Sequence, residues 1–77
     1  MGRMTRTERT RVEVAIRATG KTPRGFALAV GRSPANFFAA ITGRRRASRA
    51  EREILVRVLG LPEESLFDEG GFAVLEE

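Results

Sequence analysis

The chain has 77 residues, of which 42% are hydrophobic and 31% are charged, and its formal net charge is +4; it therefore fits one small globular domain near the lower size limit for a single core. Cysteine and histidine are both absent, which excludes disulfides, thiolate nucleophiles, cysteine-based zinc sites and the most common general base. No apolar run reaches the roughly 18 residues of a membrane span and no apolar segment follows the N-terminus, so we expect neither a span nor a secretory signal and predict a cytoplasmic location.

The first predicted helix lies within residues 7–19. Val12, Ala15, Ile16 and Thr19 recur at the spacing of one helical face. A capping box is available either from Thr5 and Glu8 or from the Thr7–Glu13 region, so the starting residue stays open. Gly20 is expected to follow its end.

Two further helices are predicted to begin with a capping residue followed by proline. Thr22 and Pro23 start a helix that reaches Val30 before Gly31, and Ser33 and Pro34 start one that reaches Thr42 before Gly43. The core-facing residues are expected to be Phe26, Ala27 and Val30 in the former and Phe37, Ala40 and Ile41 in the latter. Phe38 points about 100° away from Phe37 and does not belong to that face.

A basic loop, Arg44–Arg46, precedes the fourth predicted helix. Ser48 and Glu51 form a capping box for a helix over residues 49–59, which ends at Gly60. Its buried residues are expected to be Ile54, Leu55, Val58 and Leu59. A final helical turn near Pro62 should then dock Leu66 and Phe67 on the core.

The chain is therefore expected to be an all-α protein, a compact bundle of four to five short helices that share one core. We divide it into an N-terminal arm (1–6), a helical domain (7–67) and an acidic tail (68–77). Within the tail, Phe72–Leu75 forms an apolar run after a Gly-Gly pair. It is either a disordered terminus or a strand that pairs with a second copy, and we favour the dimer arm.

Charge is divided unevenly along the chain. Residues 1–62 hold all fourteen basic residues and four of the ten acidic ones, so they sum to +10, whereas residues 63–77 sum to −6. A basic body with an acidic end favours a polyanionic partner for the body. We expect the acidic end to face away from that partner.

The segment 22–42 is the most informative part of the sequence. It reads as a helix, a tight turn containing Gly31 and a second helix, and a turn this short makes two helices cross steeply. Two groups of residues, Phe26-Ala27-x-x-Val30-Gly31-x-Ser33 and Phe37-x-x-Ala40-Ile41-x-Gly43-Arg44-Arg45-Arg46-x-Ser48, resemble the lambda-repressor/Cro-type helix-turn-helix family. Val58-Leu59-Gly60-Leu61-Pro62-x-x-x-Leu66-Phe67 is similar to that family's closing helix and turn, so the resemblance covers about residues 10–67.

The resemblance implies a homodimeric transcriptional regulator that binds double-stranded DNA in the nucleoid. It further implies a repressor of phage or mobile-element type. It implies that residues 23–30 form the positioning helix and residues 34–42 the recognition helix. The matching base-contact positions are Ala35, Asn36, Phe38 and Ala39. Basic and hydroxyl side chains around the helix are expected to contact phosphates: Arg24, Arg32, Ser33, Thr42, Arg44, Arg45, Arg46 and Arg49.

Asn36 and Phe38 each keep an alternative interpretation. Asn36 is the one amide at these positions able to make a bidentate contact to adenine, but it also suits an ordinary exposed position in a first helical turn. Phe38 is a core residue, a contact to a thymine methyl group or a contact to a protein partner. We leave both open.

An enzymatic function is not expected. Glu51/Glu53 and Glu63/Glu64 are the close carboxylate pairs of the folded body, and each lies at a predicted helix start, where acidic residues are common. No nucleophile–base arrangement, cofactor, metal site or small-molecule ligand is indicated. Two other functions stay open: an RNA-binding basic domain, and a protein-interaction module that uses Phe38 and the tail.

Overall fold

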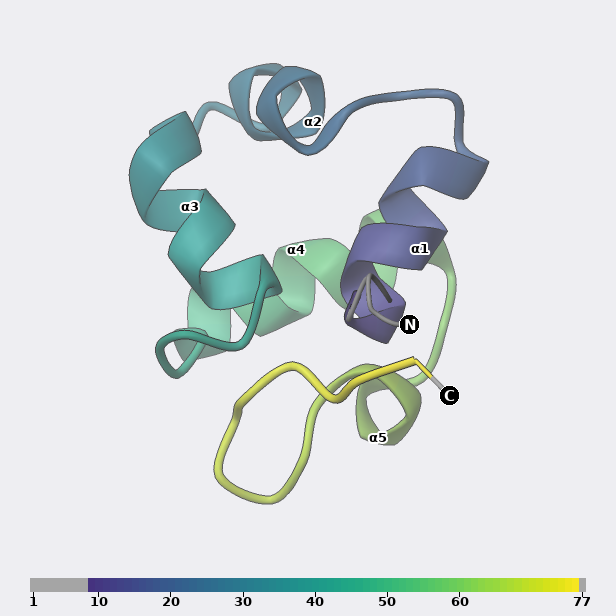
Figure 1. The fold of residues 1–77 in the computed structure, drawn as a ribbon, viewed down its shortest axis with the longest axis vertical. Coiled ribbons are helices and arrows are strands. Elements are labelled where there is room, and N and C mark those ends of the chain that lie inside the picture. The colour runs from purple at the N-terminus through teal and green to yellow at the C-terminus, as the bar shows by residue number, and fades with distance from the viewer. Residues whose placement is uncertain (1–8, 77) are drawn as a thin grey trace, which may run out of the picture.

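The computed structural model describes residues 9–76. Within this range five helices follow one another: α1 (Arg11–Ala18), α2 (Pro23–Ala29), α3 (Pro34–Ile41), α4 (Arg49–Leu59) and α5 (Glu63–Leu66). The Cα radius of gyration is 12.1 Å. Figure 1 shows α2 at one end of the molecule, α1 and α3 on its two flanks, α4 behind them and α5 at the opposite end. The predicted compact all-α bundle is confirmed.

Local sequence signals account for most helix ends. Thr10 caps α1 in a capping box with Glu13, which settles the open start; Thr5, Thr7 and Glu8 lie outside the described residues. Thr22 caps α2, and Ser48 caps α4 with Glu51, as predicted. Ser33 occupies the N-cap position of α3 but its hydroxyl makes no capping hydrogen bond. At that end the Ser-Pro pair therefore acts through the fixed backbone of Pro34 alone.

The core lies between the helices and is built from one face of each. Every residue predicted to face inward in α3 is buried, as are Phe26 and Ala27 in α2 and Leu66 and Phe67 around α5. The prediction for α4 is wrong at Val58, which is 52% exposed. The inward face of α4 is the series Glu51, Leu55 and Leu59 at four-residue spacing, which leaves Val58 to one side, and Ile54 is half-buried.

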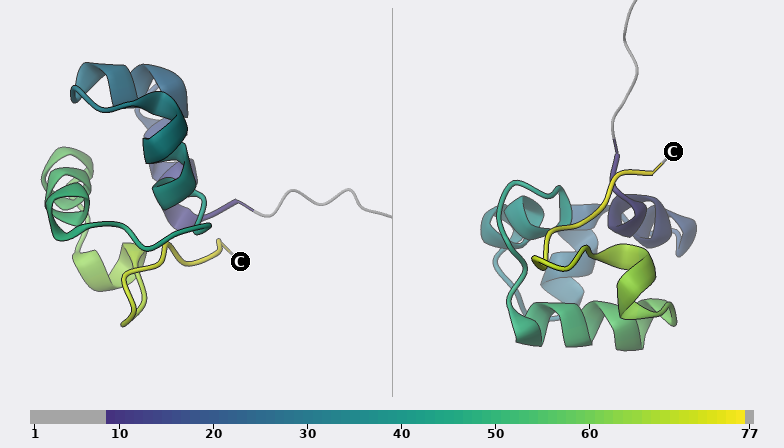
Figure 2. Two further views of the ribbon diagram at one scale, coloured as in Figure 1. Left: turned by 90° about the vertical axis from the view of Figure 1, so that its left-hand side faces the viewer. Right: turned by 90° about the horizontal axis from the view of Figure 1, so that it is seen from below.

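The C-terminal tail pairs with its own chain. Ala73 bridges to Phe67 and Leu75 bridges to Thr10, both in antiparallel fashion. The backbone N–H of Arg11 donates to the carbonyl of Val74 at 2.9 Å, and the N–H of Val74 donates to that of Leu66 at 3.0 Å. Residues 73–76 thus lie between residues 9–11 and residues 66–68 (Figure 2).

This pairing differs from both expectations for the tail. A disordered terminus does not fit, because Ala73 is buried in the core cluster. A free dimer arm does not fit either, because both edges of the segment already have partners within the chain.

Among residues 9–76, none of the helices has the length and apolar character needed to cross a membrane.

Candidate nucleic-acid interface

The α2–α3 pair is the centre of the candidate site. The Phe26 and Phe37 rings are stacked across it, with centroids 6.1 Å apart and planes inclined by 24°. Gly31 makes the short connection possible, because its φ of 76° lies in the left-handed region that side chains disfavour. The helices cross steeply, so that α3 extends along one flank of the molecule (Figure 1).

The C-terminal half of α3 is held by contacts from three other parts of the chain. The Thr10 hydroxyl at the start of α1 donates to the Ile41 carbonyl at 2.5 Å. The backbone of the tail reaches Gly43 so closely that a Cβ atom there would lie 3.1 Å from the Ala73 carbonyl oxygen. The loop that leads to α4 folds back on this half, and the N–H groups of Arg44 and Arg45 donate to the Ala39 carbonyl.

One face of α3 is turned outward, opposite the buried Phe37, Ala40 and Ile41. Ala35 and Asn36 are exposed, Phe38 is 40% exposed, and Ala39 is half-buried. Of the interpretations left open for Phe38, core residue is therefore excluded. Three of the four predicted base-contact residues are thus accessible, and Ala39 only in part.

A shallow, mainly apolar depression of about 450 Å³ adjoins this exposed face of α3. It brings the starts of α2 and α3 together with the last turn of α1, and its lining residues are Arg17, Thr22, Pro23, Arg24, Pro34, Ala35 and Phe38. Arg17 was not among the predicted site residues. Its place off the apolar face of the first helix was a signal that it is exposed, but only the packing of α1 against α2 puts it beside Arg24.

Most of the predicted phosphate contacts are accessible. Arg24, Arg44, Arg46 and Arg49 are exposed, and Arg32 is half-buried. Arg49 also pairs with Glu53 at 3.5 Å, but an ion pair between two exposed side chains is worth little and leaves the arginine available.

The two predicted hydroxyl contacts differ. The Ser33 side chain is exposed and is not used for capping. The Thr42 hydroxyl donates to the Phe38 carbonyl at 2.8 Å, so its proton is directed at its own helix. Thr42 therefore has no hydroxyl proton directed outward for a phosphate.

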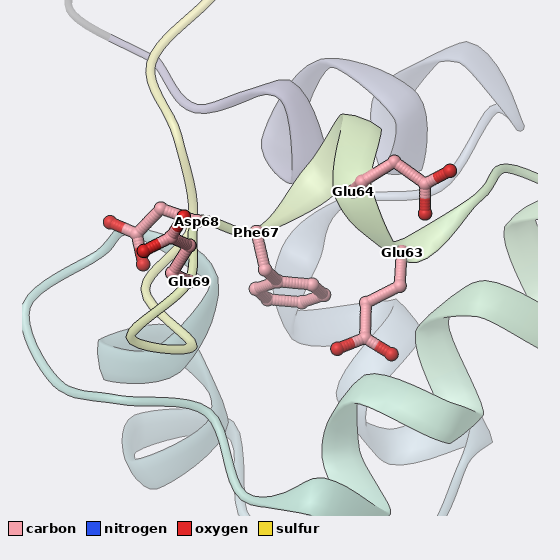
Figure 3. A pocket seen from close by; sticks show the side chains of 5 residues that line it. All are labelled: Glu63, Glu64, Phe67, Asp68 and Glu69. Carbon is pink, nitrogen blue, oxygen red and sulfur yellow. The ribbon is translucent and has the colours of Figure 1, made fainter.

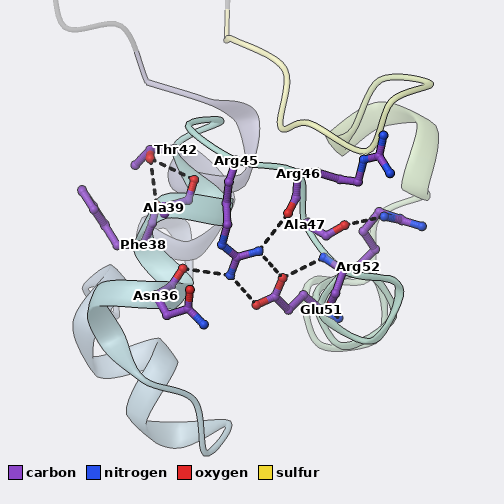
Figure 4. A network of polar contacts seen from close by, with 10 residues as sticks. Asn36, Phe38, Ala39, Thr42, Arg45, Arg46, Ala47, Glu51 and Arg52 are labelled. Atoms are coloured by element: carbon purple, nitrogen blue, oxygen red, sulfur yellow. Dashed lines mark hydrogen bonds and ion pairs between the residues drawn. The ribbon is translucent and has the colours of Figure 1, made fainter.

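Arg45 has a different role from the one predicted. Its Nη1 donates to Glu51 Oε1 at 3.0 Å, and its Nη2 donates to Glu51 Oε2 at 2.8 Å and to the Asn36 carbonyl at 2.9 Å (Figure 4). The Glu51 side chain is almost completely buried. Because both Nη atoms of Arg45 already donate to groups of the same chain, Arg45 is no longer a candidate phosphate contact.

The ion pair perturbs both of its members. Hydrogen bonds from the Arg45 side chain hold the pKa of Glu51 below its ordinary value, although burial acts in the opposite direction. The same hydrogen bonds raise the pKa of Arg45. Glu51 also accepts from the backbone N–H of Ser48 at 2.8 Å, so one carboxylate joins the cap of α4 to the arginine.

Acidic side chains gather at the other end of the molecule. Glu63, Glu64, Asp68 and Glu69 surround Phe67 in a depression of about 510 Å³ on α5 and the following turn (Figure 3). This acidic end is opposite α2 along the long axis (Figure 1). The exposed face of α3 near α2 is thus separated from the main group of carboxylates.

No protein-family model matches the chain, and no match is found among curated proteins or among solved structures. The resemblance of residues 10–67 to the lambda-repressor/Cro family therefore stays a prediction. Within the described part of the chain, no group of three or more acidic side chains is arranged to hold a metal ion.

Proposed function

We propose that this chain is a sequence-preferring regulator of transcription that binds double-stranded DNA through a helix-turn-helix formed by α2 and α3. The observation that supports this most is the contrast between the two faces of α3. Phe37, Ala40 and Ile41 bury one face in the core, whereas the other face exposes Ala35, Asn36 and Phe38. A helix presented in this way suits the major groove, which is wide enough to admit one.

The distribution of charge supports the same proposal. Arg17 and Arg24 line the depression beside the exposed face of α3, and Arg44 follows its C-terminal end. Arginines in such positions serve to contact phosphates and to set the orientation of a protein on the duplex. Arg46 lies instead in a hollow that Glu63, Asp68 and Glu69 also line, so it supports the proposal less. The acidic end lies away from α2, where it does not oppose this contact.

Sequence preference is expected to come from few side chains. Asn36 is the candidate for a bidentate contact to adenine, and Phe38 and Ala35 are candidates for apolar contact with a thymine methyl group. With one amide and two apolar residues at these positions, we propose a moderate preference for A·T-containing sites.

We also propose that the protein acts as a homodimer on half-sites about 34 Å apart, the spacing of one turn of DNA. If each subunit neutralises about four phosphates, the logarithm of affinity falls with the logarithm of salt concentration with a slope near −7. Because both edges of the tail are paired within the chain, the two-fold contact has to use another surface.

Selection of bound fragments from random duplex DNA, followed by anisotropy titrations at several salt concentrations, tests the proposal. We expect an enriched motif and a steep salt dependence. Replacing Asn36 by alanine should relax the sequence preference at one base pair. Arg24→Gln should lower the affinity for all duplexes by about the same factor. A flat selection together with salt-independent binding would contradict the proposal.

A protein partner is the second candidate, because Phe38 is exposed beside a mainly apolar depression. Under that alternative, Phe38→Ser abolishes binding of the protein partner and Arg24→Gln has little effect on it.

RNA binding is the third alternative. A competition experiment between duplex DNA and structured RNA separates it from DNA binding.

A further inference from the structure

Arg45 connects two parts of the molecule that the proposed function needs in a fixed relation. Its fork reaches the buried carboxylate of Glu51 at the start of α4 and the main-chain carbonyl of Asn36 in α3. Asn36 is also the candidate base-reading residue. The same side chain therefore touches the backbone of the residue whose side chain would read a base (Figure 4).

The geometry makes this link rigid. Glu51 is 3% exposed and accepts hydrogen bonds from both Nη atoms of Arg45, while its Oε1 also accepts from the N–H of Ser48. A planar guanidinium held on two carboxylate oxygens has little rotational freedom. The position of the Asn36 backbone is consequently tied to the N-cap of α4.

The contacts of Arg45 with Glu51 and Asn36 also explain why a lysine could not replace it. A lysine has one nitrogen on a flexible stem and cannot contact both Glu51 oxygens and the Asn36 carbonyl with the same planar geometry. An unpaired Glu51 would remain buried in the interior, where a lone charge is costly. Arg45 thus differs from Arg44, its exposed neighbour in the same loop.

We propose that Arg45 is a positioning residue: it sets the placement of α3 and its exposed face relative to α4, and thereby the sequence preference, without contacting the nucleic acid. This inference rests on the proposed DNA-binding function. It distinguishes Arg45 from Arg44 and Arg46, although the three are consecutive in the sequence.

The test compares Arg45→Gln with Arg44→Gln, a matched pair that loses one positive charge from the same loop. For each we would measure the salt slope of binding and the ratio of affinities for the selected duplex and a scrambled one. Arg44→Gln should reduce the salt slope by about one per subunit and leave the ratio unchanged. Arg45→Gln should leave the slope unchanged and lower the ratio about tenfold or more, the order of one lost base contact.

Glu51→Gln provides a second variant if Arg45→Gln does not fold, with Glu53→Gln on the exposed side of the same helix as its control. Glu51→Gln should lower the affinity ratio without removing any basic residue, and Glu53→Gln should not. An unchanged ratio in both Arg45→Gln and Glu51→Gln, or a salt slope that falls in Arg45→Gln as far as in Arg44→Gln, would overturn the inference.

A measurement without DNA keeps the inference separate from the proposed function. In amide nitrogen–proton spectra, Glu51→Gln should shift the resonances of residues 35–40 in α3 as well as those near position 51, and Glu53→Gln should shift only its surroundings. If the wild-type protein binds no duplex, the proposed function fails, and these spectra still decide whether Arg45 and Glu51 position α3. Shifts confined to residues 45–52 would reject that role.

Discussion

The hydroxyl of Thr10 donates a hydrogen bond to the main-chain carbonyl of Ile41, and it thereby joins the N-cap of α1 to the last residue of α3. Thr10 has no solvent exposure. The same hydroxyl oxygen accepts the capping hydrogen bond from the N–H of Glu13 at 3.1 Å. One side chain therefore starts a helix and anchors the end of the candidate recognition helix.

Replacing Thr10 by valine should destabilise the domain by about 1–3 kcal/mol, since it removes a helix cap and leaves a buried carbonyl without its donor. Thr10→Ser retains the hydroxyl and should cost much less. Urea denaturation of the two variants measures the difference. Equal free energies of unfolding would show that the hydrogen bond to Ile41 contributes nothing.

Gly43→Ala should destabilise the protein more than Gly31→Ala. Both glycines have a positive φ, 80° and 76° respectively, so both substitutions strain the backbone. A Cβ at position 43 would in addition lie 3.1 Å from the Ala73 carbonyl, whereas one at position 31 meets no heavy atom within 4 Å. Thermal denaturation of the pair isolates the cost of displacing the tail, and a lower melting temperature for Gly31→Ala would contradict the close approach.

Ending the chain after Gly71 should destabilise the helical domain. The truncation removes the buried Ala73 and four backbone hydrogen bonds, which join Arg11 to Val74, Asp68 to Phe72, Val74 to Leu66 and Glu76 to Arg9. At about 0.5–1.5 kcal/mol for each hydrogen bond, the loss is about 2–6 kcal/mol. Leu75→Ala, at a half-exposed side chain, serves as the control and should change stability little. A truncated chain as stable as the full one would mean that the pairing adds nothing.

Acid should weaken the protein through Glu51. Because its pKa is lower in the folded chain than in the unfolded one, ionisation of Glu51 stabilises the fold, and this contribution is fully present above the ordinary pKa of the unfolded side chain. That contribution is lost as the pH falls through the lowered folded pKa. Glu51→Gln should therefore be less stable than the wild type at neutral pH, with a smaller further loss toward pH 2. Parallel pH profiles for wild type and Glu51→Gln would refute this assignment, and Glu53→Gln supplies the control.

Arg17→Gln should reduce the salt slope of DNA binding by about one per subunit, like other losses of a phosphate contact. We expect this effect because Arg17 and Arg24 line the same depression beside the exposed face of α3. Arg57→Gln, an exposed arginine of α4 outside the candidate site, is the matched control and should leave the slope unchanged. Equal effects of the two substitutions would indicate a general influence of net charge rather than a contact.

The helices themselves were predictable from the sequence, because the signals that define them are local. Thr22 and Ser48 cap the helices that follow them through hydrogen bonds to residues three positions away. The inward face of α3 was correct because its apolar residues recur with the helical period. The exposure of Arg24, Arg44, Arg46 and Arg49 likewise agrees with their predicted places on the surface, and their contact with phosphates stays a prediction.

What only the tertiary structure decided are the contacts between segments distant in sequence. The tail was expected to be disordered or to pair with a second copy, but it pairs with residues 9–11 of its own chain. Because these residues lie more than sixty positions earlier, no local sequence pattern indicates them as the partner. In the sequence, Arg45 could not be distinguished from Arg44 and Arg46, and only the packing of the loop against α3 and α4 brings it to Glu51 and Asn36. The exposure of Val58 likewise depends on how α4 packs. Capping and helical periodicity follow from neighbouring residues, whereas the partner of a charge or of an extended segment depends on which surfaces the folded chain brings together.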